Sequence, residues 1–405
     1  EKQSHKIITN VIGQHRIFLS LGNLFVPSKM SQSPLSPNSL DINAVVELLY
    51  GFPVDGDVAS ESMDGLGGRG PSKLTKVMFG SKGRSMTLVL KQTRLPERSK
   101  LYGLTREVDF YTRHKNEVDF LAFLPQVYGA VKTEEGKKHI LMECLQFGRE
   151  LGCYFGPGSP LNWNRKDDLS TGMTSAQCAK LAFESIAKLH GKYWNSNDEL
   201  LSLKWLRGSE FRRGENEKGF LALQSYSSGI WSQIRDGQMV KAWDPFVCAL
   251  LDASFSRVSW EVFQKQWRKI PQTFVHGDFH PGNAYLCKDG TLKIIDWEMV
   301  GVGSGPQDLG QFVISHMDPD ERRSAESILL STYLGCLGAS AYNYSPEQLK
   351  ADYSMGGACR WLWFLPVLSN LPTFGEKEMM FFVQQVGEFC RDHGISPENV
   401  EMPRV

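Results

Sequence analysis

The sequence has no Cys-x-x-Cys pair, no excess of charge of either sign and no apolar run long enough to span a membrane. Its eight cysteines are scattered, which argues against a zinc or redox motif and favours a reducing, cytoplasmic compartment. The 45 basic and 45 acidic residues balance, so nothing predicts a nucleic-acid surface. A chain of 405 residues is too long for one ordinary small domain and therefore predicts two lobes or two domains. Its oligomeric state stays open.

The first part of the chain, residues 1–39, is expected to be a flexible or non-native segment. Ile17–Val26 forms a short apolar run after Arg16, as in the core of a signal or transit peptide. The run lacks a good small-residue cleavage site, and Met30 follows it closely before a stretch rich in serine and proline. We therefore expect Met30 to be the working start, with a targeting segment as the alternative.

The stretch Thr273–Asp296 concentrates the chemistry of the chain. Two apolar strands are expected there, each leading to an acid, Asp278 or Asp296, and Asn283 stands five residues after Asp278. Phosphoryl transfer uses one carboxylate to accept the hydroxyl proton, and an amide oxygen with a second carboxylate to hold Mg²⁺ on the nucleotide phosphates. The D-x-x-x-x-N spacing is also that of the protein-kinase catalytic loop. The stretch therefore predicts a site that uses ATP and Mg²⁺.

The run HGDFHPGN followed by IIDWE resembles the aminoglycoside phosphotransferase and choline kinase-like family, closest to its ecdysteroid-kinase-like branch. The resemblance implies an α+β, two-lobed protein-kinase-like fold with a small β-rich N-lobe and a larger, mostly helical C-lobe. It makes Asp278 the catalytic base and Asn283 and Asp296 the metal ligands. It also makes His276 and Asp308 structural supports of the catalytic loop. For Asp308, an ordinary helix N-cap is a second interpretation, and the two roles are compatible.

A glycine-rich segment, Asp64–Ser72, lies between two expected strands and is a candidate phosphate-covering loop. Glycine lets backbone N–H groups approach a phosphate without a Cβ in the way. The segment is not a Walker A motif, and an ordinary hairpin turn is the equal alternative. Its candidate nucleotide-binding residues are Gly65, Gly67, Gly68, Gly70 and Ser72.

Lys91 ends the apolar run of an expected strand, Ser85–Gln92, and resembles the kinase lysine that contacts the α- and β-phosphates. The alternative is an edge lysine that reaches into solvent. Its expected partner is Glu107, in an E-x-x-F-Y pattern on a helical stretch, with Asp109 as the competing acid. Further on, the segment with Glu143 and Leu145 resembles the link between lobes, whose backbone contacts the adenine edge.

The link divides the chain into an expected N-lobe, residues 40–145, and an expected C-lobe, residues 146–405. In the C-lobe, Thr174–Tyr193 keeps a helical period and begins with a T-x-x-Q capping box. His190, near the end of this helix, could contact a substrate, but a packed histidine at a helix end is favoured.

Together, these features predict an ATP-dependent phosphotransferase that moves the γ-phosphate to a hydroxyl of a small molecule, whether steroid-like, choline-like or another alcohol. A protein acceptor is disfavoured because no H-R-D, D-F-G and A-P-E set occurs. Two alternatives stay open. One is a catalytically inactive kinase-fold binding protein. The other is a metal-dependent hydrolase, because His276, Asp278 and His280 alternate and would share one face of a strand.

Overall fold

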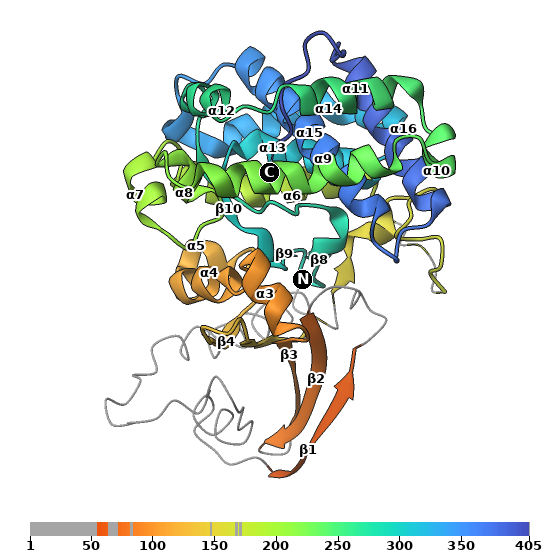
Figure 1. Cartoon of the computed structure of the whole chain (residues 1–405). Helices are drawn as coiled ribbons and strands as arrows, with labels where there is room; N and C mark the ends of the chain where they lie inside the picture. The colour runs from red at the N-terminus through yellow and green to blue at the C-terminus, as the bar shows by residue number, and fades with distance from the viewer. Residues whose placement is uncertain are drawn as a thin grey trace, which may run out of the picture.

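A computed structural model describes residues 55–63, 72–81, 84–145, 148–166, 169 and 172–404. It has a β-rich lobe, drawn at the bottom of Figure 1, and a larger helical lobe above it. This arrangement confirms the predicted fold class. The segment 1–39, with Met30, and the glycines Gly65, Gly67, Gly68 and Gly70 lie outside the described residues.

The sheet of the small lobe has five antiparallel strands in the order β1-β2-β3-β5-β4. Alternation along the strands gives it two different faces. One face carries a small apolar cluster that includes Phe79, Leu88 and Leu141. The opposite face carries Val89, Ile140 and Met142, which join the main core of the molecule. The strands are β1 (Asp55–Ser62), β2 (Ser72–Ser81), β3 (Arg84–Thr93), β4 (Val127–Lys132) and β5 (Lys138–Glu143).

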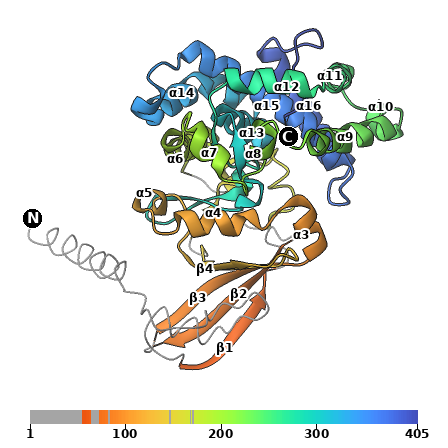
Figure 2. The same ribbon diagram turned by 60° about the vertical axis from the view of Figure 1, so that its left-hand side comes forward.

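Three helices follow β3: α3 (Pro96–Tyr102), α4 (Arg106–His114) and α5 (Val118–Leu121). The sequence reading missed α3, which has a proline in its first turn and ends at Gly103 in the left-handed conformation, with φ of 63°. Helix α4 lies between the sheet and the helical lobe in both views (Figures 1 and 2). Its Phe110 ring stacks on Trp297 at 4.1 Å between centroids, so α4 joins the two lobes.

The helical lobe begins its long helices with α6 (Ser175–Lys192), and the capping box predicted for Thr174 and Gln177 is present. Buried side chains on α6 and on α13 (Gly305–His316) place these helices in the middle of the core. The other helices of this lobe are α7 (Asn197–Ser202), α8 (Ser209–Arg212), α9 (Glu217–Ile234), α10 (Gln238–Lys241), α11 (Pro245–Ser256), α12 (Trp260–Gln266), α14 (Pro319–Leu337), α15 (Pro346–Ser369) and α16 (Glu376–Asp392). The lobe also contains two short 3₁₀ helices near the predicted catalytic stretch, η4 (Pro281–Asn283) and η5 (Trp297–Met299).

Two short sheets frame the predicted catalytic stretch. Strand β7 (Thr273–Val275) pairs with β10 (Gly301–Gly303), and β8 (Ala284–Leu286) pairs with both β6 (Arg149–Glu150) and β9 (Leu292–Ile294). The loops that leave β7 and β9 are therefore brought to the side of the lobe that faces the five-stranded sheet (Figure 1).

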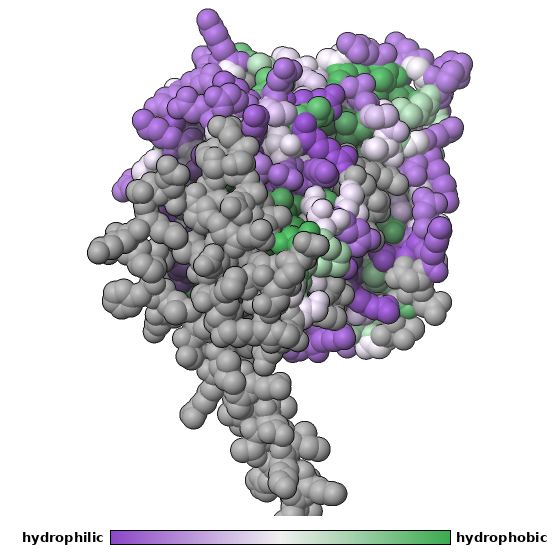
Figure 3. All heavy atoms as spheres, turned by 90° about the horizontal axis from the view of Figure 1, so that it is seen from below, coloured by the Kyte–Doolittle hydropathy of each residue, from purple (hydrophilic) through white to green (hydrophobic). Residues whose placement is uncertain are grey.

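No helix among the described residues combines the length and apolar composition needed to cross a membrane. Seen from below, hydrophilic residues rim the described surface, and hydrophobic residues come up between them in separate groups (Figure 3).

Candidate active site

The loop after β7 is fixed by one buried carboxylate. Asp308 Oδ2 accepts a hydrogen bond from the His276 backbone N–H at 2.6 Å, and Asp308 Oδ1 accepts one from the Gly277 N–H at 3.1 Å. These are the contacts that the loop-support interpretation expects. The N-cap interpretation for Asp308 is wrong, because α13 begins at Gly305 and its N-cap is Ser304.

His276 is buried beneath this loop and uses both ring nitrogens. Its Nε2 lies 2.9 Å from the Ile295 carbonyl oxygen, and its Nδ1 lies 3.3 Å from the Asp278 backbone N–H. Burial lowers the pKa of His276, although the nearby acids oppose the shift. The neutral ring thus donates from Nε2 and accepts at Nδ1, and it ties the two acid-bearing loops together.

Gly277 is required by the path of the loop. Its φ is +77°, and a Cβ at this position would lie 2.4 Å from the Met299 carbonyl oxygen. A side chain here would therefore displace the backbone that leads to Asp278.

Asp278 projects from this loop with 37% of its side chain exposed. Its backbone carbonyl accepts a hydrogen bond from Asn283 Nδ2 at 2.9 Å, and Gln311 Nε2 lies 3.4 Å from its Oδ1. A carboxylate that is held at its backbone but open to solvent can accept a proton from a bound hydroxyl.

Asn283 and Asp296 come together because β8 and β9 pair. The Asn283 carbonyl accepts a hydrogen bond from the Ile295 N–H at 2.9 Å. Asp296 has φ of 65°, which is uncommon outside glycine, and 39% of its side chain is exposed. One amide oxygen and one carboxylate are a ligand set that fits Mg²⁺, which is usually held by one or two protein groups plus phosphate oxygens.

Lys91 lies opposite these loops, on the central strand β3. Its Nζ is 2.8 Å from Asp296, 2.9 Å from Glu107 and 3.0 Å from Glu298. Burial alone would lower the pKa of Lys91, but the three carboxylates outweigh burial and raise its pKa well above the usual range. The expected Lys91–Glu107 pair is thus present, and the edge-lysine alternative is wrong. The competing acid, Asp109, pairs with Lys132.

The region that contains the catalytic loop matches a known protein family. Residues 235–337 match the model of the phosphotransferase enzyme family, and they include the loop from His276 to Asp296 and also Asp308. This segment is similar to the phosphotransferase enzyme family. The predicted family and enzyme class are confirmed at this level, whereas the ecdysteroid-kinase-like branch stays a prediction.

Solved structures of small-molecule kinases resemble the chain at low sequence identity. The choline kinase LicA from Streptococcus pneumoniae is 16% identical, with a TM-score of 0.48, over 86% of this chain and 98% of that chain. An ethanolamine kinase from Plasmodium vivax is 13% identical, with a TM-score of 0.47, over 83% of this chain and 81% of that chain. A comparison with curated proteins found no significant match.

Three charged or polar residues of the phosphotransferase site were missed or misread. Ser72, expected to face a phosphate, donates its hydroxyl to Glu298 Oε1 at 2.6 Å. Glu298 and Lys138 were not expected in the site at all, yet their side chains are 2.6 Å apart. The sequence pattern could have predicted that Lys138 points inward. It lies two and four residues from Ile140 and Met142, and therefore on the same apolar face of the strand.

Arg360 on α15 was also missed, and it supports the catalytic loop. Its guanidinium is fully buried and donates to the Gly277 carbonyl at 2.6 Å. Burial lowers the pKa of Arg360 to about 10, with Asp278 and Asp308 opposing the shift. No pattern near residue 360 in the sequence points to this contact, which spans 83 positions.

Glu107, Asp296 and Glu298 lie close enough together to hold a metal ion. The Lys91 ammonium already contacts all three carboxylates, so this position is filled by a lysine. The metal ligands expected from the sequence, Asn283 and Asp296, remain the better candidates for a cation that arrives with nucleotide.

Three further predictions concern Glu143, His190 and the alternative hydrolase site. Glu143 uses its side chain on the backbone N–H of Gln126, at 2.7 Å, so its expected adenine contact rests on the backbone and, like that of Leu145, stays a prediction. His190 is fully buried and lies 2.9 Å from the Tyr333 hydroxyl, as the packed interpretation expects. The hydrolase site is wrong, because β7 ends at Val275 and His276 has no ring nitrogen left for a metal.

Proposed function

We propose that the chain is an ATP-dependent kinase that transfers the γ-phosphate of ATP to a hydroxyl of a small molecule. The observation that carries this proposal is the placement of Asp278. It is exposed on a loop that Asp308 fixes, and Asn283 connects that loop to the segment of Asp296. The family match over the same residues supports the proposal.

Each site residue has a separate role in the proposed phosphoryl transfer. Asp278 accepts the proton of the acceptor hydroxyl and aims its oxygen. Asn283 and Asp296 would hold Mg²⁺, which neutralises charge on the phosphates when it is bound. Lys91, positioned by Glu107, donates to the α- and β-phosphates. Phosphoryl transfer needs little else from a protein than position and charge.

The nucleotide would bind between the lobes, which we divide into residues 40–145 and 146–405. The backbone of Glu143 and Leu145 would contact the adenine edge. The glycine-rich segment 64–71 would cover the phosphates, for which its composition is suited.

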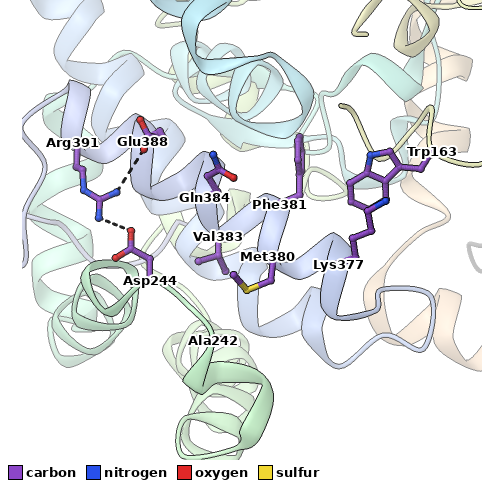
Figure 4. A pocket seen from close by; sticks show the side chains of 10 residues that line it. All are labelled: Trp163, Ala242, Asp244, Lys377, Met380, Phe381, Val383, Gln384, Glu388 and Arg391. Carbon is purple, nitrogen blue, oxygen red and sulfur yellow. Dashed lines mark hydrogen bonds and ion pairs between the residues drawn. The ribbon is translucent and has the colours of Figure 1, made fainter. Parts of the chain in front are cut away.

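For the acceptor we propose a pocket of about 490 Å³ in the helical lobe (Figure 4). Its walls combine rings and aliphatic groups, from Trp163, Met380 and Phe381, with the Asp244–Arg391 ion pair at one end. Lys377 Nζ lies 3.8 Å from the Trp163 ring centre. Because a protein ammonium already covers this indole, the pocket suits an apolar alcohol better than a choline-like cation.

A series of rings connects the pocket to the catalytic loop. Phe381 contacts His316 at 6.3 Å between ring centres, and His316 contacts His280 at 6.0 Å. His280 Nε2 is in turn 3.9 Å from Asp278 Oδ2. The pocket and the catalytic loop are thus joined by packed side chains, of which the His316 ring is buried.

We also propose a cytoplasmic location. The eight cysteines are scattered without a Cys-x-x-Cys pair, and four of them are buried, as suits a protein kept in a reducing compartment.

The proposal is tested by ADP release. Hydroxylated metabolites, apolar alcohols first, are screened with ATP and Mg²⁺, and the best acceptor is then used with Asp278→Asn. An amide cannot accept the proton, so we expect turnover to fall by about 10²–10⁴-fold while ADP still binds.

The matched control is Asp289→Asn, which makes the same chemical change on an exposed turn of the same segment and should keep full turnover. Near wild-type turnover of Asp278→Asn would show that the base is another group. Nucleotide binding without turnover on any acceptor would favour the inactive binding protein instead.

A further inference from the structure

Three donors lie on the face of the five-stranded sheet that looks toward the helical lobe. In the sheet register Ser72 pairs with Thr93, and Lys91 pairs with Ile140. Lys138 lies two residues from Ile140 and therefore on the same face, as Thr93 does relative to Lys91. The sheet thus presents Ser72, Lys91 and Lys138 side by side to whatever packs on it.

Two glutamates meet these donors and close a ring of alternating charges. Lys91 Nζ contacts Glu107 at 2.9 Å and Glu298 at 3.0 Å. Lys138 Nζ contacts the same two acids, at 2.5 and 2.6 Å. We call Lys91, Glu107, Lys138 and Glu298 the charged ring. Its side chains are at most 9% exposed.

Lys138 is fully satisfied in the ring. Its third contact is to the Leu104 carbonyl, at 3.2 Å, so each of its three N–H groups has an acceptor. A buried ammonium is tolerated only when it is paired in this way. Lys138 therefore keeps all three N–H groups on buried partners. Lys91 also has three partners, but one of them is the half-exposed Asp296, and a phosphate can replace that contact.

The net charge of the ring and Asp296 explains why a second lysine is needed. The ring itself is neutral, and Asp296 gives the group one net negative charge. Without Lys138, Lys91 alone would face three carboxylates, and the group would repel the phosphates of a nucleotide more strongly. Glu298 lies 3.0 Å from the Lys91 ammonium and 2.6 Å from the Lys138 ammonium, and two such neighbours favour the ionised carboxylate.

We infer that Lys138 is a positioning residue of the nucleotide site, which sets the charge that Lys91 presents to the phosphates. It does so by neutralising Glu107 and Glu298 and by holding them on Lys91. Glu298 follows directly after Trp297, which stacks on Phe110 of α4, so the ring also joins the sheet to the segment of Asp296. The inference rests on the proposed use of a nucleotide and extends it to a residue outside the family-matched segment.

The test measures ADP affinity without Mg²⁺, by calorimetry, in four proteins: the wild type, Lys138→Met, Glu298→Gln and the double variant. Affinity should follow the net charge of the group. Lys138→Met should bind ADP on the order of tenfold more weakly. Glu298→Gln should bind as tightly as the wild type or more tightly. The double variant restores the net charge and should recover the wild-type affinity.

Lys137→Met is the matched control, since it removes an exposed lysine at the neighbouring position and should change nothing. If Lys138 serves stability alone, the double variant and Lys138→Met will bind ADP like the wild type at temperatures where they are folded, and the inference is overturned. If Lys138→Met does not fold, a Glu298→Gln protein that binds ADP more weakly than the wild type overturns it. Failure of the wild type to bind ADP at all would instead overturn the proposed function.

Discussion

The catalytic loop and the charged ring are held in different ways. In the loop, buried side chains hold the backbone: Asp308 accepts from two N–H groups, and Arg360 donates to a carbonyl. In the ring, side chains hold one another through alternating charges. A loop of the first kind loses its shape when one anchor goes. A ring of the second kind keeps its shape when opposite charges are removed together.

The largest effect is expected at the anchor of the loop. Asp308→Asn keeps the shape of the side chain but turns an N–H₂ group toward one of the two backbone N–H donors. At least one buried donor then loses its acceptor, so we expect the free energy of unfolding to fall by about 2–4 kcal/mol. Turnover should fall by about 10²-fold or more, because the base shifts. Urea unfolding and steady-state kinetics measure the two effects.

The control for this variant is Asp320→Asn, which changes an exposed aspartate at the start of the next helix. The second substitution that restores the ring has no counterpart in the loop, because the loop groups that Asp308 holds are backbone N–H groups. An Asp308→Asn protein with unchanged stability and turnover would mean that the loop does not depend on this anchor.

The same contrast explains what the sequence could predict. The loop is readable because His276, Asp278, Asn283 and Asp296 stand within 21 residues in a fixed order. The ring is drawn from β3, α4, β5 and the segment after β9, and its Lys138–Glu298 contact alone spans 160 positions. The E-x-x-F-Y pattern revealed its Lys91–Glu107 half. The strand pattern could have placed Lys138 on the inner face of the sheet, but its pairing with Glu298 depends on lobe packing, which no local pattern encodes.

A smaller effect, on the Mg²⁺ requirement, should distinguish the metal ligands from the residues of the charged ring. Asp296→Asn removes a full charge and Asn283→Ala removes a dipole, so both should raise the Mg²⁺ concentration needed for activity. Asp296→Asn should have the larger effect, about tenfold or more. It should leave ADP binding without Mg²⁺ intact or improved, because the group with Lys91 becomes neutral. Mg²⁺ titrations at fixed ATP measure the first effect, and calorimetry measures the second.

Asp278→Asn serves as the comparison here, because the base should alter turnover but not the Mg²⁺ requirement. Equal Mg²⁺ dependence in all three variants would show that base and ligands have been divided incorrectly. Weaker Mg²⁺-free binding by Asp296→Asn would show that Asp296 supports Lys91 rather than competing with the phosphates for it.

The smallest expected effect is on the pH dependence of stability, which should differ between the catalytic loop and the charged ring. His276 has an ordinary pKa of 6.5 that burial lowers in the folded protein. Below pH 6.5 the unfolded chain therefore binds a proton that the folded loop does not, and stability falls until the folded pKa is reached. Glu298 has an ordinary pKa of 4.5, lowered in the fold by Lys91 and Lys138 despite burial, so the ring loses stability only below pH 4.5.

Urea unfolding across this range should show the two losses in sequence as pH falls. His276→Gln keeps one donor and one acceptor but does not titrate, so it should flatten the slope just below pH 6.5. The slope of the free energy of unfolding against pH should change by at most about 1.4 kcal/mol per pH unit, which corresponds to one bound proton. Glu298→Gln should leave that slope unchanged and flatten the one below pH 4.5. If His276→Gln instead leaves the upper slope as steep as in the wild type, then His276 takes up its proton equally in both states. The loop would then be held by its carboxylate and guanidinium anchors without any contribution from a neutral imidazole.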